Sequence, residues 1–313
     1  LNRENSAMPQ LKTMISSDQT PISYHRWLPK EGAVKALLLI LHGMAEHSKR
    51  YDEFAKSLTK QGFAVWAPDH RGHGKTAEGK TLGFFAEEDG WQRVADDAFE
   101  LSELINNEYP DQPLFLLGHS MGSFLARTLL VQHPDVFDGV VIVGTGRGKG
   151  LLGKAGKMIA RRNVKKYGPK HPDELLDKMS FGSYNKRIKN PVSKFDWLSR
   201  DPEQVKRYEE DPLCGYVCTS SFFKDLLTGI EIANDPNLAK QLPGDVPLYI
   251  ISGSDDPVGD YSKGVRSVYD FYKKAGVKDV ALTLVEGGRH EVLNETDRAK
   301  TYKLIAQWMK KRI

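Results

Sequence analysis

One serine lies where the sequence predicts that a strand passes directly into a helix. Four apolar residues, 114–117, lead into Gly118-His119-Ser120-Met121-Gly122, and an amphipathic segment follows. A serine on such a turn has strained backbone geometry, and side chains two positions away would collide with neighbouring elements. The helix N-terminus would direct the Met121 N–H at a developing oxyanion. The pentapeptide alone is a weak signal, but with the predicted strand before it and helix after it, it predicts that Ser120 is a nucleophile, against the alternative of a glycine-rich connection.

A serine hydroxyl becomes a good nucleophile only when a base removes its proton, and that base needs an acid to orient it. Three histidines follow Ser120 in the chain. His133 ends the helix that begins after the serine, about 20 Å away by helical rise, and is predicted to be a cap. His171 lies in a basic segment. His290 follows the last predicted strand, at the edge of a parallel sheet where functional side chains gather. We expect His290 to be the base.

The acid is expected to follow the preceding strand, in the stretch GSDDPVGD. Asp255 and Asp256 are adjacent and Asp260 lies further on. Successive residues point in different directions, so only one of the pair can reach the histidine, and spacing does not choose between them. The Met44 N–H, in the loop after the apolar run 36–41, is the candidate for a second oxyanion donor. Two backbone donors and a Ser-His-Asp set predict acyl transfer.

Strand-like and helix-like segments alternate through most of the chain, and this alternation predicts an α/β fold with a mostly parallel, doubly wound sheet. A strand hairpin is predicted over 13–29, and the alternation is interrupted between 147 and 243, where the sequence is charged and helical in character. We therefore expect a core formed by 1–146 and 244–313, with 147–243 inserted as a helical unit. Within the core, helices are predicted over Trp91–Glu108, over Tyr261–Ala275 and from Asn294 onward.

Composition limits the remaining classes. The 313 residues carry a net charge of +4, too mild to indicate nucleic-acid binding, and no apolar run is long enough to span a bilayer. The first residues lack the apolar stretch of a secretory signal, so a cytoplasmic protein is expected. Cys214 and Cys218 are predicted to be free thiols on one helix face. No second cysteine pair or histidine nearby in the sequence completes a zinc site, so no metal is expected.

Five motifs together, HGMAEHSKRY, APDHRGHGKT, GHSMGS, GSDDPVG and GGRHEVLNE, resemble the monoacylglycerol lipase and lysophospholipase branch of the α/β-hydrolase superfamily. The serine aminopeptidase-like group belongs to the same sequence family. The resemblance covers nearly the whole chain. It implies the α/β-hydrolase fold, a helical cap (lid) inserted after the sixth strand, and no cofactor.

The resemblance also assigns residues. It implies that Asp256, the second residue of the aspartate pair, is the acid. Glu46 and Arg50 match positions near the polar glycerol end of the site in monoacylglycerol lipases, which implies a role in holding a polar head group. The alternative is a salt bridge that fixes the oxyanion loop. His70, Arg71 and His73 resemble a structural loop of the family.

The insertion carries the expectation about substrate. Residues 147–170 contain nine Lys or Arg and no Asp or Glu, with apolar residues at roughly helical spacing. Such a segment is expected either to contact an anionic membrane surface or to be a solvated cap helix. Further on, an apolar stripe either lines an acyl pocket or packs the cap onto the core: Leu213, Tyr216, Val217, Phe222, Phe223, Leu226 and Leu227.

The expected function is a serine hydrolase of small-molecule or lipid-like carboxylic esters, such as a monoacylglycerol lipase, a lysophospholipase or a carboxylesterase. The alternatives are an aminopeptidase or amidase with the same triad, and a non-catalytic hydrolase-like protein that binds a ligand.

Overall fold

The computed structural model describes residues 8–148 and 150–313, and within them eight strands form one sheet. The strands are β1 (Gln10–Ile15), β2 (Pro21–Trp27), β3 (Ala36–Leu41), β4 (Phe63–Pro68), β5 (Leu114–His119), β6 (Gly139–Val143), β7 (Leu248–Gly253) and β8 (Val280–Val285). Their order across the sheet is β1-β2-β4-β3-β5-β6-β7-β8. The hairpin of β1 and β2 and the β2–β4 pair are antiparallel, and all other pairs are parallel. The predicted mostly parallel sheet with a hairpin at its start is confirmed.

The helices of the core are α1 (Asp52–Thr59), α2 (Gly90–Glu108), α3 (Met121–Gln132), α9 (Lys263–Ala275) and α10 (Arg298–Lys310). Short 3-10 helices η1 (Ser48–Tyr51) and η2 (Gly74–Ala77) lie in loops. Between β6 and β7 the chain forms α4 (Leu151–Tyr167), α5 (Glu174–Phe181), η3 (Tyr184–Arg187), η4 (Asp196–Leu198), α6 (Pro202–Glu210), α7 (Ser220–Ala233) and α8 (Pro236–Ala239). No helix in the described part of the chain is long and apolar enough to cross a membrane.

The buried strands separate two hydrophobic layers because successive side chains point to opposite faces of the sheet. Along β3, Leu37, Leu39 and Leu41 belong to the core cluster that α2, α3 and α9 cover. The intervening β3 residues, 36, 38 and 40, belong to the second cluster, which α1 and α10 cover. Strands apolar on both faces are what a doubly wound sheet requires.

Two predicted helix starts were too early. Helix α9 begins at Lys263, because Asp260, Tyr261 and Ser262 have positive φ angles that a helix does not accommodate. Helix α10 begins at Arg298 rather than at Asn294, because the segment before it is a loop that bonds to Ser199 and Arg200 of the insertion. The sequence pattern does not reveal this loop, because the partners that fix it lie far away in the chain.

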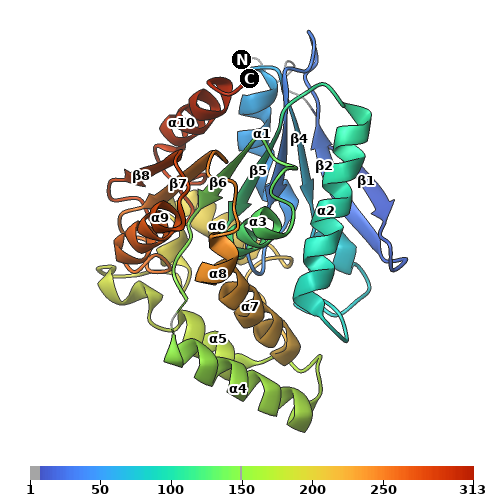
Figure 1. Cartoon of the computed structure of the whole chain (residues 1–313). Coiled ribbons are helices and arrows are strands. Elements are labelled where there is room, and N and C mark those ends of the chain that lie inside the picture. The colour runs from blue at the N-terminus through green and yellow to red at the C-terminus, as the bar shows by residue number, and fades with distance from the viewer. Residues whose placement is uncertain (1–7, 149) are drawn as a thin grey trace.

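The insertion has two different parts. Helices α4 and α5 lie at the end of the molecule opposite the chain termini, and α7 runs from them toward the sheet (Figure 1). Phe222 and Phe223 of α7 are buried in the same cluster as α2 and α3. Gly229 allows this approach, since a Cβ there would lie 2.0 Å from the Trp91 ring. These α7 residues of the predicted apolar stripe therefore pack the insertion onto the core.

The two cysteines correct another expectation. Both Cys214 and Cys218 are buried free thiols, as predicted. They do not share a helix face, however, because both lie in the loop between α6 and α7. This loop crosses from the insertion to the core: the Gly215 N–H donates to the Ala45 carbonyl at 2.9 Å.

Candidate active site

Ser120 lies on the turn from β5 into α3, with φ 53° and ψ −117°. A positive φ is uncommon for a residue with a side chain and marks stored backbone strain. The two glycines of the motif make the turn sterically feasible. A Cβ on Gly118 would lie 2.1 Å from the Gly122 carbonyl oxygen, and one on Gly122 would lie 2.0 Å from the Leu41 carbonyl oxygen. The turn places the half-buried Ser120 at the carboxyl end of β5, directly before α3.

His290 and Asp256 form a buried pair at the same edge. His290 Nδ1 lies 2.9 Å from Asp256 Oδ2, and the two residues are 2% and 0% exposed. The other carboxylate oxygen of Asp256 accepts a hydrogen bond from the Val258 N–H at 2.8 Å, and Ser252 Oγ donates to Oδ2 at 3.2 Å. These bonds fix the carboxylate, which in turn orients the imidazole.

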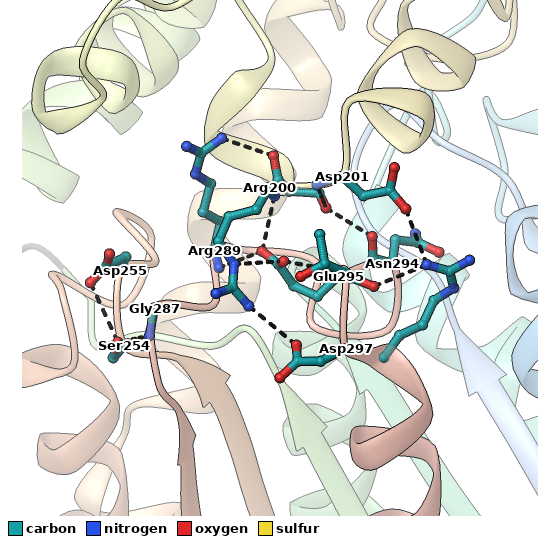
Figure 2. A network of polar contacts seen from close by, with 12 residues as sticks. Arg200, Asp201, Ser254, Asp255, Gly287, Arg289, Asn294, Glu295 and Asp297 are labelled. Carbon is teal, nitrogen blue, oxygen red and sulfur yellow. Dashed lines mark hydrogen bonds and ion pairs between the residues drawn. The ribbon is translucent and has the colours of Figure 1, made fainter.

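The structure separates the aspartates that the spacing left open. Asp255 is exposed, its side chain lies next to Ser254 (Figure 2), and its backbone N–H donates to the Gly288 carbonyl at 2.9 Å. Asp260 is also exposed. Of the three, Asp256 is the buried one, and it is the one that bonds to His290. The other two histidines lie elsewhere: His133 ends α3 and stacks on Phe99, and His171 lies in the insertion against Tyr167.

Two aromatic rings flank the His290 imidazole. The His119 ring, one residue before Ser120, lies 4.8 Å from it between centroids, and the Trp197 ring lies 5.1 Å from it. His119 comes from the core and Trp197 from η4 of the insertion. The position of the imidazole next to the serine turn therefore depends on both parts of the chain.

The backbone of the His290 loop is bonded to residues 196–201 of the insertion. The His290 N–H donates to the Trp197 carbonyl at 3.3 Å and the Glu291 N–H to the Leu198 carbonyl at 2.7 Å. Arg289 Nη1 donates to the Asp196 and Ser199 carbonyls at 2.7 and 2.9 Å. Residues 196–201, which we call the strap, thus run alongside the loop that carries His290.

One buried carboxylate joins the strap to this loop (Figure 2). Glu295 is 0% exposed and accepts from the Arg200 backbone N–H and from Arg200 Nε, at 3.1 and 2.8 Å. It also accepts from the backbone N–H groups of Arg289 and Thr296, at 2.9 and 3.1 Å. Since all four donors converge on one carboxylate, Glu295 fixes the strap and the histidine loop as a unit.

Glu46 and Arg50 form a second buried network, behind the predicted oxyanion loop. Glu46 accepts from the Gly43 N–H at 2.6 Å, from Tyr51 Oη at 3.0 Å and from Arg50 Nη1. Arg50 also makes a bidentate pair with Glu291, at 2.6 and 2.7 Å. These contacts favour the second of the two alternatives for Glu46 and Arg50, a network that fixes the loop carrying Met44, over direct contact with a head group.

The charges of this network stabilise one another. Burial opposes ionisation of Glu46, but Arg50 and then His119 outweigh it and hold the pKa of Glu46 well below its usual range. Burial likewise lowers the pKa of His119, but its contact with Glu46, at 3.2 Å, raises it above the ordinary value. The His119 side chain, whose ring lies next to the His290 imidazole, is thus held by a charged partner.

Sequence reasoning missed the strap, Trp197 and Glu295. Glu291 and Glu295 stand in the quoted motif after His290, and two carboxylates next to a functional histidine were a usable signal. Their partners Arg50 and Arg200 lie far off in the sequence, so only the folded chain could identify them. In the DHRGHG loop, Arg71 pairs with Asp18 and Asp97 at 2.6 and 2.7 Å. These ion pairs agree with the structural role that the resemblance implies for this loop.

The sheet order, the strained serine turn and the insertion after the sixth strand define an α/β-hydrolase. Comparison with known proteins agrees with this class. Residues 32–297 match the family described as "Serine aminopeptidase, S33". Because the match extends over most of the chain, the protein belongs to this family.

Named relatives and a solved structure narrow the class. The mouse monoglyceride lipase is 29% identical over 314 residues, covering 99% of this chain and 93% of its own. The monoacylglycerol lipase of Mycolicibacterium smegmatis is 27% identical and covers 92% of both chains. The crystal structure of a thermostable carboxyl esterase from Bacillus coagulans in complex with glycerol has a TM-score of 0.89, at 27% identity and covering 97% and 98% of the two chains. The chain is accordingly an ester hydrolase.

Proposed function

We propose that this hydrolase cleaves lipid-like carboxylic esters through an acyl-enzyme on Ser120. The observation that carries the proposal is the buried His290–Asp256 pair beside the strained turn of Ser120, at the start of α3. A base held in one tautomer by a buried carboxylate, next to a serine at a helix N-terminus, is the arrangement that acyl transfer requires.

The proposed mechanism has two halves. Ser120 Oγ attacks the ester carbonyl carbon while His290 takes the hydroxyl proton, and the carbonyl oxygen becomes an oxyanion bound by the Met44 and Met121 N–H groups. His290 then gives the proton to the leaving alkoxide, which departs as the alcohol and leaves the acyl group on Ser120. Water attacks this acyl group with the same base, and the acid is released. Asp256 stabilises the imidazolium that forms in each half.

The surroundings of His290 support a hydrophobic acyl group. Trp197 next to the imidazole belongs to an apolar cluster in the insertion that also touches the core. Its members are Phe181, Tyr184, Ile188, Phe195, Trp197, Leu198, Tyr208, Cys214 and Val258. We assign residues 147–243 as a cap over a core of 1–146 and 244–313, and medium- or long-chain monoacylglycerols and lysophospholipids as the substrate class. The names of the mouse and mycobacterial relatives agree with this class.

Helix α4 is the proposed membrane-facing surface of the cap. Leu151, Leu152 and Met158 are 83%, 75% and 68% exposed, in a helix that contains Lys and Arg but no acidic residue. Of the nine basic residues counted in the sequence, Lys149 lies outside the described residues. Exposed apolar side chains among cations suit transient contact with an anionic lipid surface. The cytoplasmic location stays a prediction.

The test is the Ser120→Ala variant with a panel of esters. Ester turnover should fall by about three orders of magnitude or more, and a fluorophosphonate probe should no longer label the protein. Ser123→Ala is the matched control that keeps its label, because the Ser123 hydroxyl is already bonded to the Ser120 carbonyl and to Thr145. Near-full esterase activity in Ser120→Ala would overturn the proposal. Turnover of a p-nitrophenyl ester series measures the preferred acyl chain length, and turnover of monoacylglycerols against lysophospholipids measures the preferred head group.

The family description raises an aminopeptidase or amidase as the second candidate. An aminopeptidase needs a free carboxylate to bind the substrate's ammonium group. Two buried carboxylates near the predicted oxyanion loop, Glu46 and Glu291, are already paired with Arg50. We therefore place the ester reading first. Faster turnover of aminoacyl-nitroanilides than of esters would favour the aminopeptidase or amidase instead. If the protein is not labelled by the fluorophosphonate and hydrolyses neither substrate class, it would be the non-catalytic ligand-binding protein.

A further inference from the structure

Three side chains outside the proposed catalytic machinery converge where the insertion meets the core. Single ligand atoms of His47, Asp211 and Cys214 all lie within 4.8 Å of one another. His47 Nε2 is 2.9 Å from Asp211 Oδ2, across 164 positions of sequence. The sequence offered no histidine near the cysteines, so the fold creates this cluster.

The two loops that supply these side chains are already fixed to each other. The Gly215 N–H of the second loop and Tyr208 Oη of α6, the helix before that loop, both donate to the Ala45 carbonyl, each at 2.9 Å. Within the second loop, the Cys214 N–H donates to the Asp211 carbonyl at 2.9 Å. Binding a ligand here would therefore need little ordering of the backbone, which is the costly part of building such a site.

The donor set selects one class of metal ion. A thiolate, an imidazole and a carboxylate together suit zinc, whereas magnesium and calcium take oxygen ligands. With zinc–ligand bonds of 2.0–2.3 Å, tetrahedral ligand atoms stand about 3.5 Å apart, so a contraction of about 1 Å in the widest pair closes the set. His47 and Cys214 are 9% and 8% exposed, and the Asp211 side chain is 32% exposed, which leaves an entry path from solvent.

The local charge balance tolerates a dication. Arg50 lies close to the Cys214 thiol, but Glu46 and Glu291 both pair with it. Adding Asp211 and a Cys214 thiolate gives four negative groups against one arginine. Cys214 also belongs to the apolar cluster around Trp197, where its thiol packs as a small apolar side chain.

We propose that His47, Asp211 and Cys214 form a zinc-binding site with a fourth position open to water. On binding, the Cys214 S–H bond breaks and its proton goes to solvent. Bonds form from zinc to Cys214 Sγ, to His47 Nε2 with the ring proton on Nδ1, and to an Asp211 oxygen. Zinc keeps its charge of two and no electron is transferred. The ion would tie the loop that follows β3, which carries Met44, to the loop between α6 and α7.

Cobalt and zinc titrations of the chelator-treated protein test the site. We expect one Co²⁺ per chain with a thiolate-to-cobalt charge-transfer band, and one Zn²⁺ with release of a thiol proton and a higher Tm. Cys214→Ser should abolish the band, and Cys218→Ser, the other buried cysteine, should keep it. His47→Gln should weaken zinc binding by about 10- to 100-fold or more. Losing a residue that only hydrogen-bonds to a metal ligand already costs that much, and His47 is proposed to be a ligand itself.

The circular dichroism of each variant and its binding of a fluorophosphonate verify that it is folded. If Cys214→Ser does not fold, Asp211→Asn and His47→Gln replace it, and both should weaken zinc binding. The proposal is overturned if the wild-type protein shows no thiolate band, if the band persists in Cys214→Ser, or if zinc binds equally to wild type and to His47→Gln.

Discussion

The strap, residues 196–201, and helix α4 belong to the same insertion but meet the rest of the molecule in different ways. The strap is bonded to the histidine loop through its backbone carbonyls and through the buried Glu295 carboxylate. Helix α4 lies against α7 (Figure 1), with Gly156 and Ala160 buried. Its large apolar side chains Leu151, Leu152 and Met158 are exposed. The difference indicates that the insertion combines a part bonded to the loop that carries His290 with an outer part, helix α4, whose large apolar side chains are exposed.

Disrupting the strap should have the largest effect. Glu295→Ala leaves Arg200 and three backbone N–H groups without their buried acceptor, so the free energy of unfolding should fall by about 3–5 kcal/mol. Ester kcat should fall as well, because the loop that holds His290 loses its anchor. Urea unfolding and steady-state kinetics measure both. Glu286→Ala, which removes an exposed carboxylate after β8, is the control, and equal behaviour of the two variants would contradict a positioning role.

The contact of α7 with the core should depend on pH through Asp225. This carboxyl is 4% exposed and faces the start of α2, and burial raises its pKa from 3.8 to about 6. A raised pKa gives stability that is fully present below pH 3.8 and is lost as the pH rises through about 6. Asp225→Asn should therefore gain stability over wild type across this window, by up to about 3 kcal/mol, since one pKa unit corresponds to about 1.4 kcal/mol.

Unfolding curves at pH 4 and pH 7 check the Asp225 prediction. The exposed Asp270→Asn on α9 should show no comparable dependence on pH. A stability difference between Asp225→Asn and wild type that stays the same at the two pH values would mean that the carboxyl is ionised in both, against the burial argument.

Substitutions in the outer part of the insertion, helix α4, should change stability least and lipid binding most. Leu152→Gln and Met158→Gln on α4 should change the free energy of unfolding by no more than about 0.5 kcal/mol, because both side chains are exposed. Both should reduce co-sedimentation with vesicles containing anionic phospholipid. Leu304→Gln on α10, at 39% exposure, is the matched control. Unchanged vesicle binding would remove the membrane role from α4, and a large loss of stability would place α4 with the strap.

Much of the fold could be predicted because its signals are local. Continuous apolar runs mark β3, β5 and β7 as strands buried on both faces, and glycines that leave no room for a Cβ mark the Ser120 turn. The start of α10 could not be predicted, because the residues before it follow the loop bonded to the strap. The spacing of the two cysteines likewise predicted that they share one face of a helix. In the structure both lie in the loop that connects α6 to α7.

The sequence by itself determined the α/β class, the place of the insertion and the identity of Ser120 and His290 as candidates, because strand and turn patterns depend on neighbours a few residues apart. Residue spacing left the aspartate open and only the resemblance implied Asp256; the tertiary structure shows the bond from Asp256 to His290, the pairing of Glu46 with Arg50, and the approach of His47 to Cys214. Each of these depends on contacts between segments widely separated in the chain. Such contacts arise from packing and charge pairing after the chain has folded, and residue spacing does not encode them.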